Sequence, residues 1–142
     1  MAKASSETIS EAGDFKVDAV SITTSTGLVV DLLGSVMHIT FFESIENATI
    51  TGNILLSDYV NLVAIGPIIG QEFIKLKLRT PGMSGENGVI DFSKNVLVVT
   101  SMKTRDNIGN GQQAVLLEFS SAEMLKNERT KLNSSYEGTC SE

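Results

Sequence analysis

A histidine-centred catalytic triad is the first chemistry that the residue types allow. His38 is the only histidine among the 142 residues, so a Ser-His-Asp arrangement would have to use it. It lies in the apolar run 36–43, where a strand histidine is more commonly satisfied by packing or by a backbone contact. Cys140, the only cysteine, lies close to the end of the sequence and has no visible activating base. Neither residue predicts a nucleophilic enzyme.

Paired carboxylates are the next candidate for catalysis. Glu43 and Glu46 flank an expected turn, and Asp14 and Asp18 lie on or near the first expected strand. Because any fold with 17 acidic residues contains such pairs, they do not indicate acid–base catalysis. The glycine-rich stretches lack the ending of a P-loop, and the ligand series of an EF-hand is missing. We therefore expect no enzyme, no cofactor and no metal site.

A row of cations is the most specific polar feature. Lys75, Lys77 and Arg79 alternate with apolar residues in the run 72–79, so three positive charges share one face of a strand. A solvated outer face, or an edge strand protected against aggregation, is the simpler interpretation. The functional interpretation is a charged wall that faces a partner subunit or a polar channel. We treat the three residues as a candidate assembly or lumen face.

Two adjacent isoleucines form a second candidate. Ile68 and Ile69 lie between Gly66 and Gly70 in an expected loop. There they either pack against the core or offer a hydrophobic contact to a neighbour, and the sequence does not separate these interpretations. We treat the pair as a candidate partner-contact loop.

The composition limits the partners. Eleven Lys and Arg against 17 Asp and Glu give a net charge of −6, which opposes binding to phosphate backbones, so we expect no specific nucleic acid. A single cysteine excludes an internal disulfide and favours an intracellular, reducing origin. The chain has neither a signal-peptide pattern nor an apolar run of about 18 residues, so we expect no membrane insertion.

Short β-rich runs separated by turn residues must position these candidates. Residues 28–33 suit either a strand or a helical turn, and residues 105–111 suit a flexible turn. Two of the expected strands, separated by residues 44–47, suit an antiparallel hairpin. The expected strands are residues 15–22, 36–43, 48–55, 72–79, 90–92, 96–102 and 114–119.

Two short helices complete the expected elements. Ser57 or Asp58 caps the first helix, which stops at a Gly-Pro pair. The second covers residues 122–128, and Ser120 and Glu123 have the spacing of a capping box at its start. The fold class that follows is mainly β, an antiparallel barrel or sandwich with one or two short helices.

The composition changes near both ends, which predicts three parts. Residues 1–14 are expected to form a flexible N-terminal arm, residues 15–130 the β-barrel domain, and residues 131–142 a linker-like tail.

An ordered set of segments carries a resemblance to a known family. The segments are residues 41–54, Ser57 and Asp58, Leu62, residues 67–72, residues 80–82, residues 117–123, Asn127 and residues 134–138. Their order resembles the N-terminal domain of baseplate hub proteins of large contractile-tailed (myovirus) bacteriophages. The resemblance covers residues 15–138, and the ordered set carries it rather than any single motif.

The resemblance implies a tail-tube-like β-barrel in the tail baseplate of a virion, made in the host bacterial cytoplasm. Hub proteins of this type are trimers with two such barrels per subunit, which form a pseudo-sixfold ring between the central spike and the tail tube. The implied partners are copies of the chain itself, in a trimer or hexameric ring, and other baseplate, spike and tail-tube proteins. Because that family continues beyond the position of Glu142, we expect an amino-terminal fragment or a reduced single-domain version.

Two other functions remain open at this point. The runner-up is a stand-alone β-barrel binding module for a small ligand or peptide, held by the loops at residues 82–88 and 105–111. An enzyme that uses His38 is third.

Overall fold

The protein is mainly β and antiparallel. The computed structural model describes residues 15–58, 61–83, 88–109 and 112–131. The elements in chain order are β1 (Lys16–Thr23), β2 (Val29–Asp31), β3 (Val36–Phe42), β4 (Thr51–Asp58), α1 (Leu62–Ile65), β5 (Phe73–Arg79), β6 (Val89–Asp91), β7 (Leu97–Gly109), β8 (Gln112–Ser121) and α2 (Glu123–Arg129).

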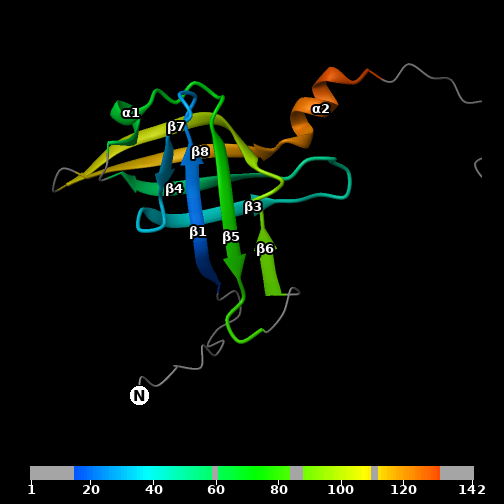
Figure 1. Ribbon diagram of the computed structural model, residues 1–142, viewed down its shortest axis with the longest axis horizontal. Coiled ribbons are helices and arrows are strands. Elements are labelled where there is room, and N and C mark those ends of the chain that lie inside the picture. The colour runs from blue at the N-terminus through cyan, green and yellow to red at the C-terminus, as the bar shows by residue number, and fades with distance from the viewer. Residues whose placement is uncertain (1–14, 59–60, 84–87, 110–111, 132–142) are drawn as a thin grey trace, which may run out of the picture.

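The strands form one sheet that curls into a half-barrel (Figure 1). Its order is β2-β1-β5-β7-β8-β4-β3, and β6 pairs with β5 beside this path. The expected mainly β, antiparallel fold with short helices is thus confirmed. The expected arm at residues 1–14, and residues 132–142 of the expected tail, lie outside the described residues.

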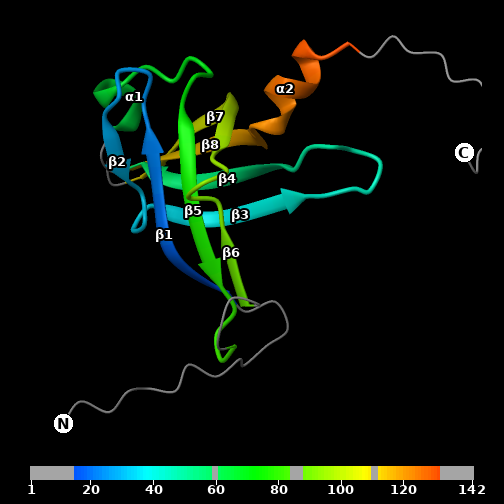
Figure 2. The same ribbon diagram turned by 45° about the vertical axis from the view of Figure 1, so that its right-hand side comes forward.

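Two groups of strands run across each other. In Figures 1 and 2, β1, β5 and β6 run upright, whereas β3, β4, β7 and β8 cross behind them. β5 joins the groups by pairing Phe73 with Val98 and Ile74 with Leu97 on β7. Such a corner lets a sheet fold over itself, so its two halves enclose one core.

Alternating side chains fill the space between the two groups. Successive side chains of a strand point to opposite faces, so every second residue of β4 and β5 is buried and the others face outward. The alternation expected for β5 is therefore confirmed. Members of this core on β4, β5 and β8 are Ile54, Leu56, Ile74, Leu76, Leu78, Val115, Leu117 and Phe119.

Gly52 is the one inward position of β4 that carries no side chain. It pairs with Phe119 on β8. A Cβ at Gly52 would collide with the carbonyl oxygen of Thr40 and would lie 2.6 Å from the Phe119 ring. The glycine therefore lets β3, β4 and the aromatic ring approach one another closely.

The connection between β2 and β3 crosses the open side of the sheet path. Leu32 is buried and donates its N–H to the carbonyl of Val20 on β1 at 3.0 Å. Three residues later, the carbonyl of Ser35 accepts the N–H of Ser57 on β4 at 2.7 Å. The run 28–33, ambiguous in sequence, thus contains a short strand, and the chain itself links the two ends of the sheet.

Both helices are short, and neither has the expected N-cap residue. Asp58 accepts the N–H of Leu62 with both carboxylate oxygens at 2.9 Å, but it is the last residue of β4, and the N-cap of α1 is Asn61. The capping box expected for α2 is wrong, because Ser120 remains in β8 and donates to the carbonyl of Ile50. Glu123 instead accepts a hydrogen bond from the Ser121 side chain.

The flexible turn expected at residues 105–111 is also wrong over most of its length. β7 continues to Gly109, where it pairs with Gln112, and Asn107 pairs with Gln113. The long partner strand β8 supplies ladder hydrogen bonds that outweigh the turn preference of Asn and Gly. Register shifts absorb the mismatch between the strands, and they lie between Val99 and Ser101, Met102 and Thr104, and Asn107 and Gly109.

Candidate assembly site

The three cations lie on the outer face of β5, as the sequence predicted. The β1 neighbours of the two lysines are small, because Ala19 pairs with Lys77 and Ser21 pairs with Lys75, whereas Arg79 pairs with Lys16. Lys75 is exposed, and no ion pair joins it to a described residue. We call Lys75, Lys77 and Arg79 the cation face. At Lys75 and Lys77, a long charged side chain lies beside a short one on β1.

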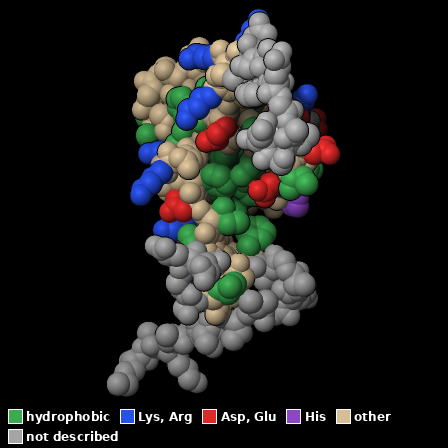
Figure 3. Space-filling view, turned by 90° about the vertical axis from the view of Figure 1, so that its right-hand side faces the viewer, with side chains coloured by type: hydrophobic (Ala, Val, Ile, Leu, Met, Phe, Trp, Pro, Cys, Tyr) green, Lys and Arg blue, Asp and Glu red, His purple; other side chains and the backbone are tan. Residues whose placement is uncertain are grey.

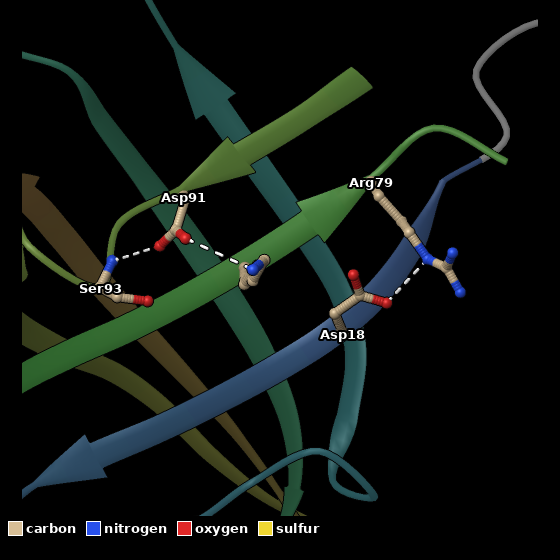
Figure 4. A network of polar contacts seen from close by, with 5 residues as sticks. Asp18, Arg79, Asp91 and Ser93 are labelled. Atoms are coloured by element: carbon tan, nitrogen blue, oxygen red, sulfur yellow. Dashed lines mark hydrogen bonds and ion pairs between the residues drawn. The ribbon is translucent and has the colours of Figure 1, made fainter. Parts of the chain in front are cut away.

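Two of these cations are paired with carboxylates (Figure 4). Lys77 Nζ lies 3.6 Å from Asp91 Oδ2 on β6, and Arg79 Nε lies 2.9 Å from Asp18 Oδ1 on β1. Hydrogen bonds from Ser93, and the charge of Lys77, hold the pKa of Asp91 below its ordinary value. The face is thus partly neutralised, and Lys75 carries the charge most available to a partner.

The structure separates the two isoleucines of the candidate loop. Ile68 is half-buried and packs against the hydrophobic core. Ile69 is 59% exposed. Core packing therefore applies to Ile68. Ile69 is the residue that a partner can contact.

A buried carboxylate positions Ile69. Glu72 is completely buried, and its two oxygens accept the N–H groups of Ile69 and Gly70 at 2.9 Å and of Gln71 at 3.1 Å. Three backbone donors on one carboxylate compensate for the loss of its hydration. Gly70 has φ of +85°, a left-handed conformation that suits glycine.

Sequence reasoning did not identify Glu72 as a structural residue. The signal was a charged residue directly after a glycine-containing loop and directly before a strictly alternating strand. A carboxylate in that position is well placed to accept the backbone donors of the turn that precedes it.

Edge strand β3 adds exposed apolar surface. Met37 and Phe42 are 54% and 56% exposed. β4 is the pairing partner of β3 in the sheet, and on its other side no described strand pairs with it. His38 lies on this strand opposite Leu55 and is exposed, so it is not satisfied by packing.

The remaining candidates for chemistry are not brought together. In the described ranges, no three His, Cys, Asp or Glu side chains are grouped closely enough to hold a metal ion. Cys140 lies outside the described residues. Of the two loops considered for a ligand, residues 84–87 and 110–111 also lie outside them, and residues 105–109 belong to β7.

No helix in the described part of the chain is long and apolar enough to cross a membrane. Comparison with protein-family models, curated proteins and solved structures finds no match to this chain.

Proposed function

We propose that this chain is a non-enzymatic structural protein of a bacteriophage virion, a baseplate hub or tail-tube-like barrel domain. It acts by assembling into a trimeric or hexameric ring on the tail axis, between the central spike and the tail tube. The ordered sequence resemblance to hub proteins is the starting point of this proposal. The partners it names are further copies of the chain and other baseplate, spike and tail-tube proteins.

The observation that carries the proposal is the open half-barrel. Its sheet path stops at β2 on one side and at β3 on the other, so two different edges are available among the described strands. Two different surfaces that fit each other make a head-to-tail contact, and such contacts form a ring when the rotation between neighbouring copies closes. Exposed Met37 and Phe42 on β3 supply apolar area for such a contact.

The cation face and Ile69 fit the same function. Ile69 is exposed on a loop that Glu72 fixes, so little loop ordering is required when a neighbour covers it. Lys75, Lys77 and Arg79 face away from the core, where they contact an acidic surface of a neighbour or line a polar channel. A stable ring would bury about 1,000 Å² or more at each contact.

The direct test is the oligomeric state of the 142-residue chain. We expect native mass spectrometry over a concentration series to detect trimers or hexamers, with or without purified spike or tube protein. A strict monomer at high concentration that also fails to bind either protein contradicts the proposal.

A second candidate function is a stand-alone β-barrel binding module. An apolar hollow of about 280 Å³ that Phe41, Ile50, Ile90 and Phe92 line favours it. A ligand-dependent rise in melting temperature, without self-association, would select this function over the ring.

A further inference from the structure

An apolar hollow opens on the face of the molecule that Figure 3 shows. It measures about 280 Å³, and its apolar lining comes from Phe41, Ile50, Ile90 and Phe92. Phe41 and Phe92 stack with ring centroids 5.7 Å apart, so the floor is an aromatic pair held from β3 and from the segment after β6. Ile90 is 53% exposed, which leaves apolar surface uncovered at the margin.

One carboxylate, that of Glu43, lines this hollow, and a second lies in the hollow beside it. Glu43 lines both the apolar hollow and an adjoining polar hollow of about 310 Å³, which Glu123 also lines. Hydrogen bonds from its own N–H and from Ser121, and the charge of nearby Lys126, lower the pKa of Glu123, so its carboxylate is ionised at neutral pH. No Lys or Arg of the described residues lines either hollow.

We propose that this hollow binds a peptide segment of a partner protein, in which one large apolar side chain is flanked by Lys or Arg. A space of about 300 Å³ is at the lower end for ligand pockets, so it suits one inserted side chain better than a larger cofactor. The aromatic floor receives the apolar group. Glu43 at the rim and Glu123 in the adjoining hollow attract the flanking cations.

The charges decide which class of partner fits. Nucleic acids and anionic membrane surfaces both present phosphates, and the carboxylates at the rim repel them. A basic peptide is attracted by the same carboxylates. The inference is independent of ring formation, because it concerns a hollow within one copy of the chain.

The test uses the absence of tryptophan from the full chain. The probe is the peptide acetyl-Lys-Trp-Lys-amide, whose tryptophan emission, excited where tyrosine absorbs little, has no counterpart in the protein. We expect its emission to shift to the blue and to saturate on titration with the protein. The acidic peptide acetyl-Glu-Trp-Glu-amide should bind at least fivefold more weakly, and the difference should shrink at high salt.

Two variants assign the binding to this hollow. Glu43→Gln removes one rim charge, and we expect severalfold weaker binding of the basic peptide with no loss for the acidic one. Ile90→Ser should weaken both peptides. The matched control is Ile69→Ser, because Ile69 is similarly exposed and does not line the hollow. The melting temperature of each variant verifies folding, and Glu43 is an exposed residue whose change leaves the core intact.

Several results would overturn the proposal. Equal affinity for both peptides removes the role of charge, and binding that neither variant weakens lies elsewhere. Absence of any spectral shift excludes this peptide class. Self-association that is lost in Ile90→Ser identifies a second copy as the occupant. The ring proposal is unaffected by these results if the Ile90→Ser variant still forms the trimers or hexamers.

Discussion

The buried carboxylate of Glu72 accepts the backbone N–H of exposed Ile69 at 2.9 Å. A charge in the interior thus determines where a surface side chain lies. The same carboxylate binds the next two N–H groups, so the loop has little freedom to rearrange. This contact connects the stability of the barrel with the geometry of the candidate partner-contact loop.

Removal of the Glu72 carboxylate should be costly. We expect Glu72→Ala to lower the free energy of unfolding by about 3 kcal/mol, because three backbone donors lose a charged acceptor. Urea denaturation measures the change. Glu46→Ala, an exposed acid of another loop, should change stability by less than about 0.5 kcal/mol. Equal effects of the two variants would contradict the role assigned to Glu72.

The two isoleucines should respond oppositely to Ser. Ile68→Ser should destabilise the protein by about 1–3 kcal/mol, because a half-buried side chain that packs on the core is lost. Ile69→Ser should leave stability within about 0.5 kcal/mol and weaken self-association. Thermal unfolding and native mass spectrometry together distinguish the two. Unchanged oligomers in Ile69→Ser would remove this residue from the assembly surface.

The cation face should matter for assembly more than for folding. Changing Lys75, Lys77 and Arg79 together to Ser breaks two partly exposed ion pairs, each worth about 1 kcal/mol or less. We expect a small fall in melting temperature and a clear change in the oligomer distribution and its salt dependence.

A triple variant of equal charge change is the control for that experiment. Lys94→Ser, Lys126→Ser and Arg129→Ser remove three exposed cations from other elements. If assembly depends on the cations of β5 rather than on total charge, this control variant should still form the oligomers. If the cation-face variant assembles normally and only melts at a lower temperature, the face is simply solvated.

Gly52→Ala tests the close approach of β3, β4 and Phe119. The added methyl group collides with a backbone oxygen and a ring, so we expect the free energy of unfolding to fall by about 1–3 kcal/mol or more. Phe119→Leu in the same chain should relieve only part of the strain, since the Thr40 carbonyl remains. Gly27→Ala is the comparison. Gly27 has φ of +85°, but a Cβ added there would meet no atom within 4 Å, so the stability change of this variant measures backbone strain alone. A smaller loss at Gly52 than at Gly27 would contradict the steric explanation.

Asp91 should make folding weakly dependent on pH. Its pKa in the folded protein is lowered, mainly by the Ser93 side chain, so its contribution is present above the unfolded value of about 3.9. The contribution is lost as the pH falls through the lower folded value. We expect the melting-temperature difference between wild type and Asp91→Asn to be constant from pH 5 to 7 and to shrink below about pH 4. Ser93→Ala should reproduce part of it, whereas a difference that grows in acid would contradict the sign.

Local patterns predicted well where one face of a strand is buried. The alternation of β5 identified Ile74, Leu76 and Leu78 as core and the cations as outward, because pleating alone decides this. Local residue preferences failed where pairing with a strand distant in the sequence determines the structure. Asn107 and Gly109 favour a turn, yet pairing with β8 keeps them in a strand.

The same reason explains what was missed at the candidate site. Ser120 has the spacing of a capping residue, but its hydroxyl is used by Ile50, which is distant in sequence. The difference between Ile68 and Ile69 depends on which one faces the core, and residue type does not encode that. The apolar hollow joins β3 to the segment after β6, so it exists only in the folded chain.

The connection from Leu32 to Ser35 also affects how the half-barrel unfolds. β2 and β3 lie at opposite ends of the sheet path but are neighbours in the chain, so neither edge strand is able to peel away without pulling on the other. Fraying, which begins at the edges of most open sheets, is therefore opposed by a covalent tether. The consequence is cooperativity: we expect the half-barrel to unfold in one step rather than strand by strand.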